Sequence, residues 1–112
     1  MTITFQQLID DNTLLEQVKA AILARIAAMG PAEVYILTRE CLTHIPELTP
    51  FNFEPTIKQA LDSLMGEGML ERTTENGVTT YDLTDKYYNI DDCLNNYQEY
   101  KEPVEDLYRE CG

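Results

Sequence analysis

The chain has 112 residues, with 8 Lys and Arg against 20 Asp and Glu, so its formal net charge is −12. Hydrophobic residues make up 44% and charged residues 25% of the chain, which is typical of a folded domain rather than a disordered acidic tail. This length suits one domain over residues 1–112. Phosphates are held by clustered Lys and Arg, so the charge argues against a partner bound mainly through phosphates. It favours a protein partner, a basic surface or simple solubility.

Residues 1–11 carry no basic region, and no apolar run approaches the ~18 residues of a membrane span, so we expect neither a signal peptide nor membrane insertion. Cys41, Cys93 and Cys111 form no CxxC pair, which is typical of reduced thiols and not of a disulfide or zinc framework. We therefore expect a cytoplasmic protein.

Two long helices are predicted first. A capping box at Thr13 and Glu16 opens a helix that Gly30 and Pro31 end. A similar box at residues 4–7 predicts a short helix before it. The apolar residues of the long helix recur at spacings of three and four: Leu15, Val18, Ile22, Ile26 and Met29. A second helix is expected over residues 32–42, its inward side chains being Val34, Leu37 and Cys41.

A third helix and a β-hairpin follow. The helix runs from residue 53 or 55 to 65, and its buried stripe is Ile57, Leu61 and Leu64. Residues 69–74 and 78–83 are β-type runs around Asn76 and Gly77, a pair that supplies the two positive-φ positions of a type I′ turn. A two-residue loop implies four cross-strand pairs: Leu70 with Leu83, Arg72 with Tyr81, Thr74 with Thr79, and Glu71 with Asp82. Because like charges opposite each other destabilise a strand pair, another contact must hold this hairpin.

The C-terminal third is predicted to be helical. Thr84 is expected to cap a helix whose stripe is Tyr87, Ile90, Leu94 and Tyr97. Residues 104–111 suggest a further short amphipathic helix. The single domain therefore divides into a core over residues 13–83 and a helical extension over residues 84–112.

This order of elements resembles a winged helix-turn-helix domain, an α+β fold with a three-helix core, a β-hairpin wing and C-terminal helices. Residues 61–72 are similar to the end of a recognition helix that runs into a wing, and residues 78–84 are similar to the returning wing strand. PadR- and MarR-type regulators share this pattern, and the resemblance covers roughly residues 14–90. It implies a DNA-reading ancestor, although a fold alone does not determine function.

The resemblance implies DNA contacts from the third helix and the wing, with Lys58, Gln59, Ser63 and Arg72 as the candidate residues. Residues 33–83 contain three cations and nine carboxylates, a net charge of −6 where a DNA reader is expected to be positive. A duplex-binding protein typically neutralises about 6–10 phosphates. We therefore expect no strong direct nucleic-acid binding, and a dimeric transcription regulator of PadR or MarR type is the alternative.

Catalytic constellations are missing from the sequence. His44 is the only histidine and Ser63 the only serine, and they belong to different elements. Asp91 and Asp92 are adjacent, so their side chains diverge on a helix instead of forming an acid–base couple. We predict no enzyme activity, no metal site and no cofactor.

The acidic surface has two interpretations. It is either a solvated exterior or a set of carboxylates spaced to occupy a basic groove on another protein. The second interpretation predicts an acidic, non-catalytic winged-helix module that regulates a nucleic-acid-related process through protein contact, with an inhibitor or nucleic-acid mimic as one form. Its candidate partner-binding residues are Glu71, Glu75, Asp82, Asp91, Asp92, Glu99, Glu102, Glu105 and Asp106.

Five of the seven tyrosines lie in the last 26 residues, and tyrosine is enriched where proteins meet. The resemblance implies that the terminal helices build a dimer. A homodimer seam of Tyr87, Ile90, Leu94 and Tyr97 is therefore expected. Packing of this stripe against the first long helix of the same chain is the other use left open.

Overall fold

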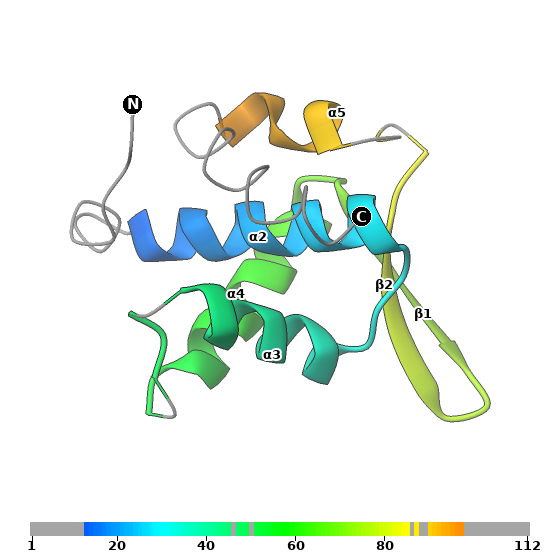
Figure 1. Ribbon diagram of the computed structural model, residues 1–112. Helices are drawn as coiled ribbons and strands as arrows, with labels where there is room; N and C mark the ends of the chain where they lie inside the picture. Colours follow the sequence, from blue (N-terminus) through cyan, green and yellow to red (C-terminus); the bar gives the residue numbers. More distant parts are fainter. Residues whose placement is uncertain (1–12, 46, 50, 86, 88–89, 98–112) are drawn as a thin grey trace.

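The described part of the chain has an α+β arrangement of three helices, a two-stranded antiparallel hairpin and a short helix (Figure 1). The computed structural model describes residues 13–45, 47–49, 51–85, 87 and 90–97. The elements are α2 (Thr13–Met29), α3 (Val34–His44), α4 (Phe53–Gly66), β1 (Leu70–Glu75), β2 (Val78–Leu83), α5 (Ile90–Leu94) and the 3₁₀ turn η2 (Asn95–Tyr97). The short helices predicted near residues 4–9 and 104–111 lie outside the described residues. None of the described helices is long and apolar enough to cross a membrane.

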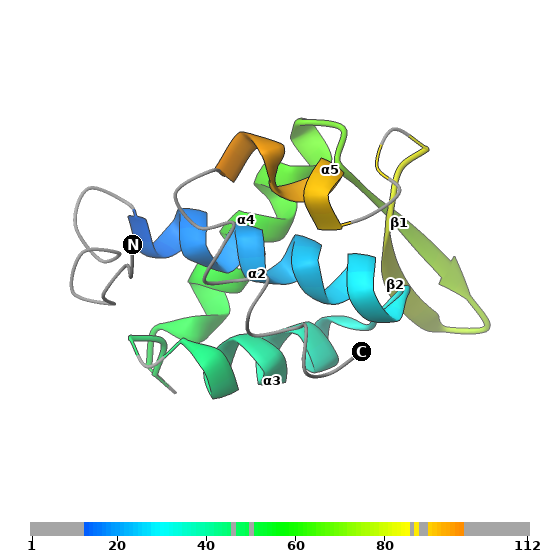
Figure 2. The ribbon, with the colours of Figure 1, turned by 45° about the horizontal axis from the view of Figure 1, so that its top comes forward.

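Helix α2 is the centre of the molecule. It contacts α3 and α4 on one side and α5 on the other, and Figures 1 and 2 show it between these helices. Val18, Ile22 and Ile26 of the predicted apolar face are buried, whereas Met29, at the end of the helix, is 49% exposed. Burial extends beyond one stripe, because Leu23 and its small neighbours are also inaccessible. The helix is therefore enclosed rather than half-buried.

The second and third predicted helices form, and the structure corrects two details of the second helix. Leu37 and Cys41 of α3 are buried as expected, but Val34 is 45% exposed. The structure also corrects the start of this helix, because Ala32 lies outside it. Its backbone pairs with Tyr81 of β2 through N–H···O bonds of 3.1 and 2.8 Å, and this bridge ties the hairpin to the connection between α2 and α3. In α4 the predicted stripe is confirmed: Ile57, Leu61 and Leu64 are buried.

The hairpin has the predicted register. Every pair named from the sequence is present, including Glu71 opposite Asp82. Asn76 and Gly77 have φ values of 53° and 79°, as a type I′ turn requires. β1 begins one residue later than predicted, at Leu70. The expectation that an Asn-Gly pair closes a two-residue loop is confirmed.

Thr84 does not cap a helix. Its hydroxyl donates to the carbonyl of Gly68 at 2.7 Å, and its N–H donates to the carbonyl of Met69 at 3.2 Å. The next described helix begins only at Ile90. Thr84 therefore closes the base of the hairpin and supplies one of the contacts that offset the like-charge pair.

Candidate functional site

The outer face of the hairpin is acidic. Side chains alternate between the two faces of a strand, so Glu71 and Glu75 of β1 share one face with Asp82 of β2. Glu71 and Glu75 are exposed and Asp82 is partly exposed. One oxygen of Asp82 accepts the N–H of Leu83 at 2.8 Å. We call Glu71, Glu75 and Asp82 the acidic wing face.

The opposite face of the hairpin is held by other contacts. The hydroxyls of Thr74 and Thr79 lie 2.9 Å apart in a hydrogen bond, and Arg72 pairs with Tyr81. Tyr81 is buried, and its backbone forms the bridge to Ala32. These contacts, with the turn and Thr84, hold the strands together although Glu71 faces Asp82.

Two of the described cations are used inside the fold. The ammonium of Lys19 lies 3.5 Å from Glu16 and 3.3 Å from Glu67, and the side chain of Lys19 is only 5% exposed. Arg25 lies 3.9 Å from Glu40, and its side chain is 13% exposed. These two cations therefore offer no charge to a partner.

The remaining described cations gather at one groove. Arg39 of α3, Lys58 of α4 and Arg72 of β1 are exposed and line a groove of about 850 Å³ together with Glu54 and Asp62. The lining of the groove is largely apolar. The other lining residues are Val34, Tyr35, Thr38, Leu42, Thr43, Phe53, Ile57, Leu61 and Tyr81. The groove therefore presents three cations and two carboxylates.

The structure brings together only part of the predicted DNA-binding set. Lys58 and Arg72 line the groove, whereas Gln59 and Ser63 do not. Gln59 is exposed and Ser63 is partly buried. Arg39 was not among the predicted residues, because nothing in the sequence places it beside Lys58 and Arg72.

The predicted C-terminal acidic set is described only in part. Asp91 is exposed and Asp92 partly exposed on α5. The other members, Glu99, Glu102, Glu105 and Asp106, lie outside the described residues. The acidic wing face is therefore the part of the predicted partner-binding set that is described in full.

Leu94 and Tyr97, two members of the predicted dimer seam, are buried within a single chain. The helix α5 that carries Leu94 packs against α2, and Tyr87 packs partly buried against the same core. The side chain of Ile90 lies outside the described set. Leu94 and Tyr97 therefore pack within their own chain, which is the alternative to a dimer seam given above. The homodimer itself stays a prediction.

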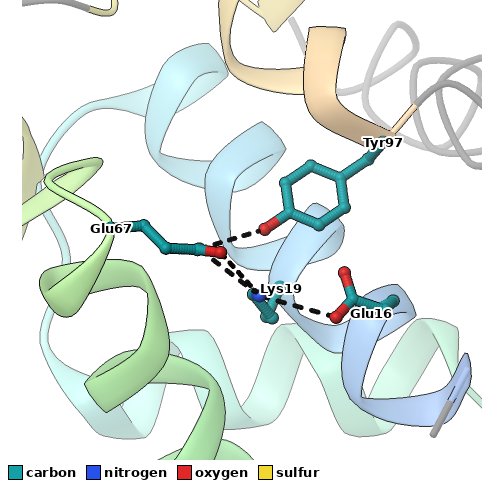
Figure 3. Close-up of polar contacts among 4 residues, drawn as sticks. All are labelled: Glu16, Lys19, Glu67 and Tyr97. Atoms are coloured by element: carbon teal, nitrogen blue, oxygen red, sulfur yellow. Dashed lines mark hydrogen bonds and ion pairs between the residues drawn. The ribbon is translucent and has the colours of Figure 1, made fainter.

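A polar cluster fastens Tyr97 to the core (Figure 3). The Tyr97 hydroxyl donates to Glu67 at 3.4 Å, and the Lys19 ammonium lies 5.5 Å from the centre of the tyrosine ring. Burial, followed by the nearby charges of Glu67 and Glu16, raises the pKa of Tyr97. The buried ammonium of Lys19 thus joins residues from α2, the end of α4 and η2. No sequence motif predicts this cluster.

The described residues include no group of His, Cys, Asp and Glu side chains that could hold a metal ion. Burial, helped by the charge of Glu40, raises the pKa of the Cys41 thiol to about 12, and burial with Asp92 raises that of Cys93 to about 12. Both thiols therefore stay protonated and unreactive at neutral pH. His44 lies 3.5 Å from Glu40, one turn earlier on α3.

Searches among protein families, curated proteins and solved structures gave no match to the chain.

Proposed function

We propose that the chain is a non-catalytic winged-helix interaction module that contacts a basic surface on a partner protein and thereby regulates a nucleic-acid-related process. In one form of this function, the module is an inhibitor that imitates nucleic acid in a basic groove of its partner. A steered encounter between opposite charges would favour fast association.

The order of the elements supports the winged-helix part of this proposal. Three helices precede the hairpin, and the hairpin returns to the body through the bridge between Tyr81 and Ala32. Helix α5, which follows the hairpin, packs on the central helix α2. This layout is compatible with a winged helix whose wing projects from the helical core (Figure 2).

The observation that carries the proposal is the acidic wing face. Glu71 stands directly opposite Asp82, an arrangement that weakens a two-stranded hairpin. Glu75 adds a third carboxylate on the same face, and no described cation shares that face. A solvated exterior needs carboxylates but does not need them in destabilising positions, so a partner with complementary charge is the better account.

A charge-swap experiment tests the proposal. The double variant Glu71→Lys/Asp82→Lys and a control, Glu54→Lys/Asp62→Lys, undergo the same change in net charge, one on the wing and the other at the groove. Each is used beside the wild type as bait in a cell lysate, and the captured protein is purified and titrated directly. We expect the wing variant to bind that protein at least tenfold more weakly and the control to bind within twofold of the wild type. Equal weakening by both variants, or by neither, contradicts the proposal.

A DNA-binding transcription regulator of PadR or MarR type is the second candidate, and one observation favours it. Arg39, Lys58 and Arg72 converge on the groove beside α4 despite the acidic composition of the chain. Under this alternative, exchanging Lys58 and Arg72 for Gln weakens duplex binding at least tenfold. Exchanging Glu54 for Gln and Asp62 for Asn strengthens it, because two repulsive carboxylates are removed. Duplex binding that neither exchange changes contradicts a role for the groove.

A further inference from the structure

Among the described residues, no strand pairs with the outer edge of β1. In an antiparallel pair, residues alternate between positions that exchange hydrogen bonds with the neighbouring strand and positions whose backbone groups point away from it. Tyr81 exchanges its bonds with Ala32, on the far side of β2, so Tyr81 and its partner Arg72 occupy an outward-pointing position. Thr74 is two residues further along β1, so its backbone N–H and C=O also point away from β2.

The outward groups of Arg72 and Thr74 are therefore open. Within the described residues, no backbone hydrogen bond beyond the hairpin reaches either of them. The side chains of β1 from Glu71 to Glu75 are all exposed. β1 contacts α4, whereas β2 contacts both α2 and α3. The edge thus offers two N–H donors and two carbonyl acceptors in a row.

We propose that the edge of β1 accepts an extended, Lys- or Arg-bearing segment of the partner protein as an added strand. This mode of recognition takes affinity from main-chain hydrogen bonds and specificity from alternate side chains. The inference rests on the proposed function and names the part of the partner that makes the contact.

Charge determines the pattern of the added strand. Its residues opposite Glu71 and Glu75 lie on the acidic wing face, and these two positions are four residues apart. The residue opposite Arg72 lies on the other face, where a second cation would be repelled. The fitting segment therefore carries two cations four residues apart, with neutral residues between them.

The same charges argue against a second copy of this chain as the added strand. Antiparallel pairing of two β1 strands about Thr73 would place Glu71 of each copy beside Glu75 of the other. Charges on an edge strand commonly prevent such self-pairing. A basic segment gains attraction at the positions where a second copy meets repulsion.

The test adds the synthetic peptide Thr-Lys-Thr-Val-Thr-Lys-Thr, with blocked ends, to the full chain. NMR measures the binding of the peptide and the amide hydrogen exchange of the chain. A control peptide of the same composition, Thr-Lys-Thr-Val-Lys-Thr-Thr, places its lysines three apart and so on opposite faces. We expect the first peptide to slow amide hydrogen exchange at Arg72 and Thr74 at least fivefold and to bind at least fivefold more tightly than the control. Absence of binding, equal binding of both peptides, or slowed exchange elsewhere alone overturns the inference.

Two proline variants isolate the backbone contact. Thr74→Pro removes an outward N–H from β1, whereas Thr79→Pro removes one from the opposite edge of the same pair. Both variants lose the hydrogen bond between the two threonine hydroxyls, so they are matched. We expect at least fivefold weaker peptide binding for Thr74→Pro and a change within twofold for Thr79→Pro. Should either variant unfold, the exchange measurement on the unaltered chain still decides the outcome.

The edge inference and the proposed function can fail separately. Lost capture in the Glu71→Lys/Asp82→Lys variant, together with no peptide-induced slowing at Arg72 and Thr74, leaves the proposed function standing and removes the added strand. Unchanged capture in that variant removes the proposed function itself.

Discussion

Lys19 is a buried ammonium whose two carboxylate partners are themselves about half exposed. Glu16 and Glu67 lie 3.5 and 3.3 Å from it, with side-chain exposures of 40% and 47%. Removing one carboxylate leaves the charge of the buried ammonium only partly compensated. For fully buried pairs, such a removal lowers the free energy of unfolding by about 3–5 kcal/mol. Exposure of the carboxylates reduces this cost, because water solvates them in competition with Lys19. The cluster matters mainly because it joins α2, α4 and η2.

We predict that Glu67→Ala lowers the free energy of unfolding by about 1–2 kcal/mol, because Lys19 keeps only Glu16 and the Tyr97 hydroxyl loses its acceptor. Lys19→Met, which removes the buried charge, should cost less than Glu67→Ala. Urea unfolding measures both. As a control, Glu54→Ala on the exposed start of α4 should change stability by no more than about 0.5 kcal/mol. Equal effects of Glu67→Ala and Glu54→Ala contradict the role given to the cluster.

At the scale of elements, the turn of the hairpin provides a matched pair of glycines. Gly77 has a φ of 79° and Gly66 ends α4, and an added Cβ would meet no atom within 4 Å at either position. Only backbone conformation separates them. We predict that Gly77→Ala lowers the free energy of unfolding by about 1–2 kcal/mol and that Gly66→Ala raises it by up to about 1 kcal/mol. Thermal or urea unfolding gives both values, and a shift of the same sign in both variants is the contrary result.

The pair of Glu71 and Asp82 links the stability of the hairpin to its proposed role. Glu71→Lys replaces a like-charge pair by an opposite-charge pair, so we predict a stability gain of about 0.2–1 kcal/mol at low salt. The gain should shrink at about 1 M salt, where the Debye length is about 3 Å. Unfolding curves at the two salt concentrations measure it. A loss of stability in this variant would show that Glu71 supports the fold and would remove the reason to assign it to a partner.

Local patterns were the part of the fold that the sequence predicted well. Asn76 and Gly77 determine the loop length, and the loop length determines every pair in the hairpin. The bridge of Ala32 was not predictable, because a single paired residue has no periodicity and Ala favours helix. The prediction that Thr84 caps a helix is wrong for a related reason. A hydroxyl before a helical pattern suggests a cap, and the sequence does not show that this hydroxyl donates to the carbonyl of Gly68 instead.

The candidate site divides in the same way. The acidic wing face follows from strand alternation and could be derived from the sequence. The groove could not, because Arg39, Lys58 and Arg72 come from three elements and meet only through tertiary packing. The sequence also does not predict that α2 is enclosed. The apolar stripe of α2 predicts one buried face, whereas α5 covers a second face of the helix.

At the scale of the whole molecule, the net charge of −12 is unevenly distributed. Residues 1–32 contribute −1, residues 33–83 contribute −6 and residues 84–112 contribute −5. In the described part of the chain, Lys19 and Arg25 are engaged within the fold, so Arg39, Lys58 and Arg72 are the cations left at the surface. Their groove also holds Glu54 and Asp62. These cations are too few for the about 6–10 phosphate contacts that a duplex-binding protein typically makes, and the two carboxylates beside them would repel phosphates.

Titration of random-sequence duplex DNA with the wild-type chain at ~50 mM salt, followed by fluorescence anisotropy, tests the central claim most directly. Low salt strengthens phosphate contacts, so these conditions favour DNA binding as far as the chain allows. If the chain acts by protein contact through its acidic wing face, we expect no DNA binding at protein concentrations below about 10 μM. Such an affinity would be weaker than that of tight non-specific DNA-binding proteins. A sub-micromolar dissociation constant would contradict the account and favour the DNA-binding regulator.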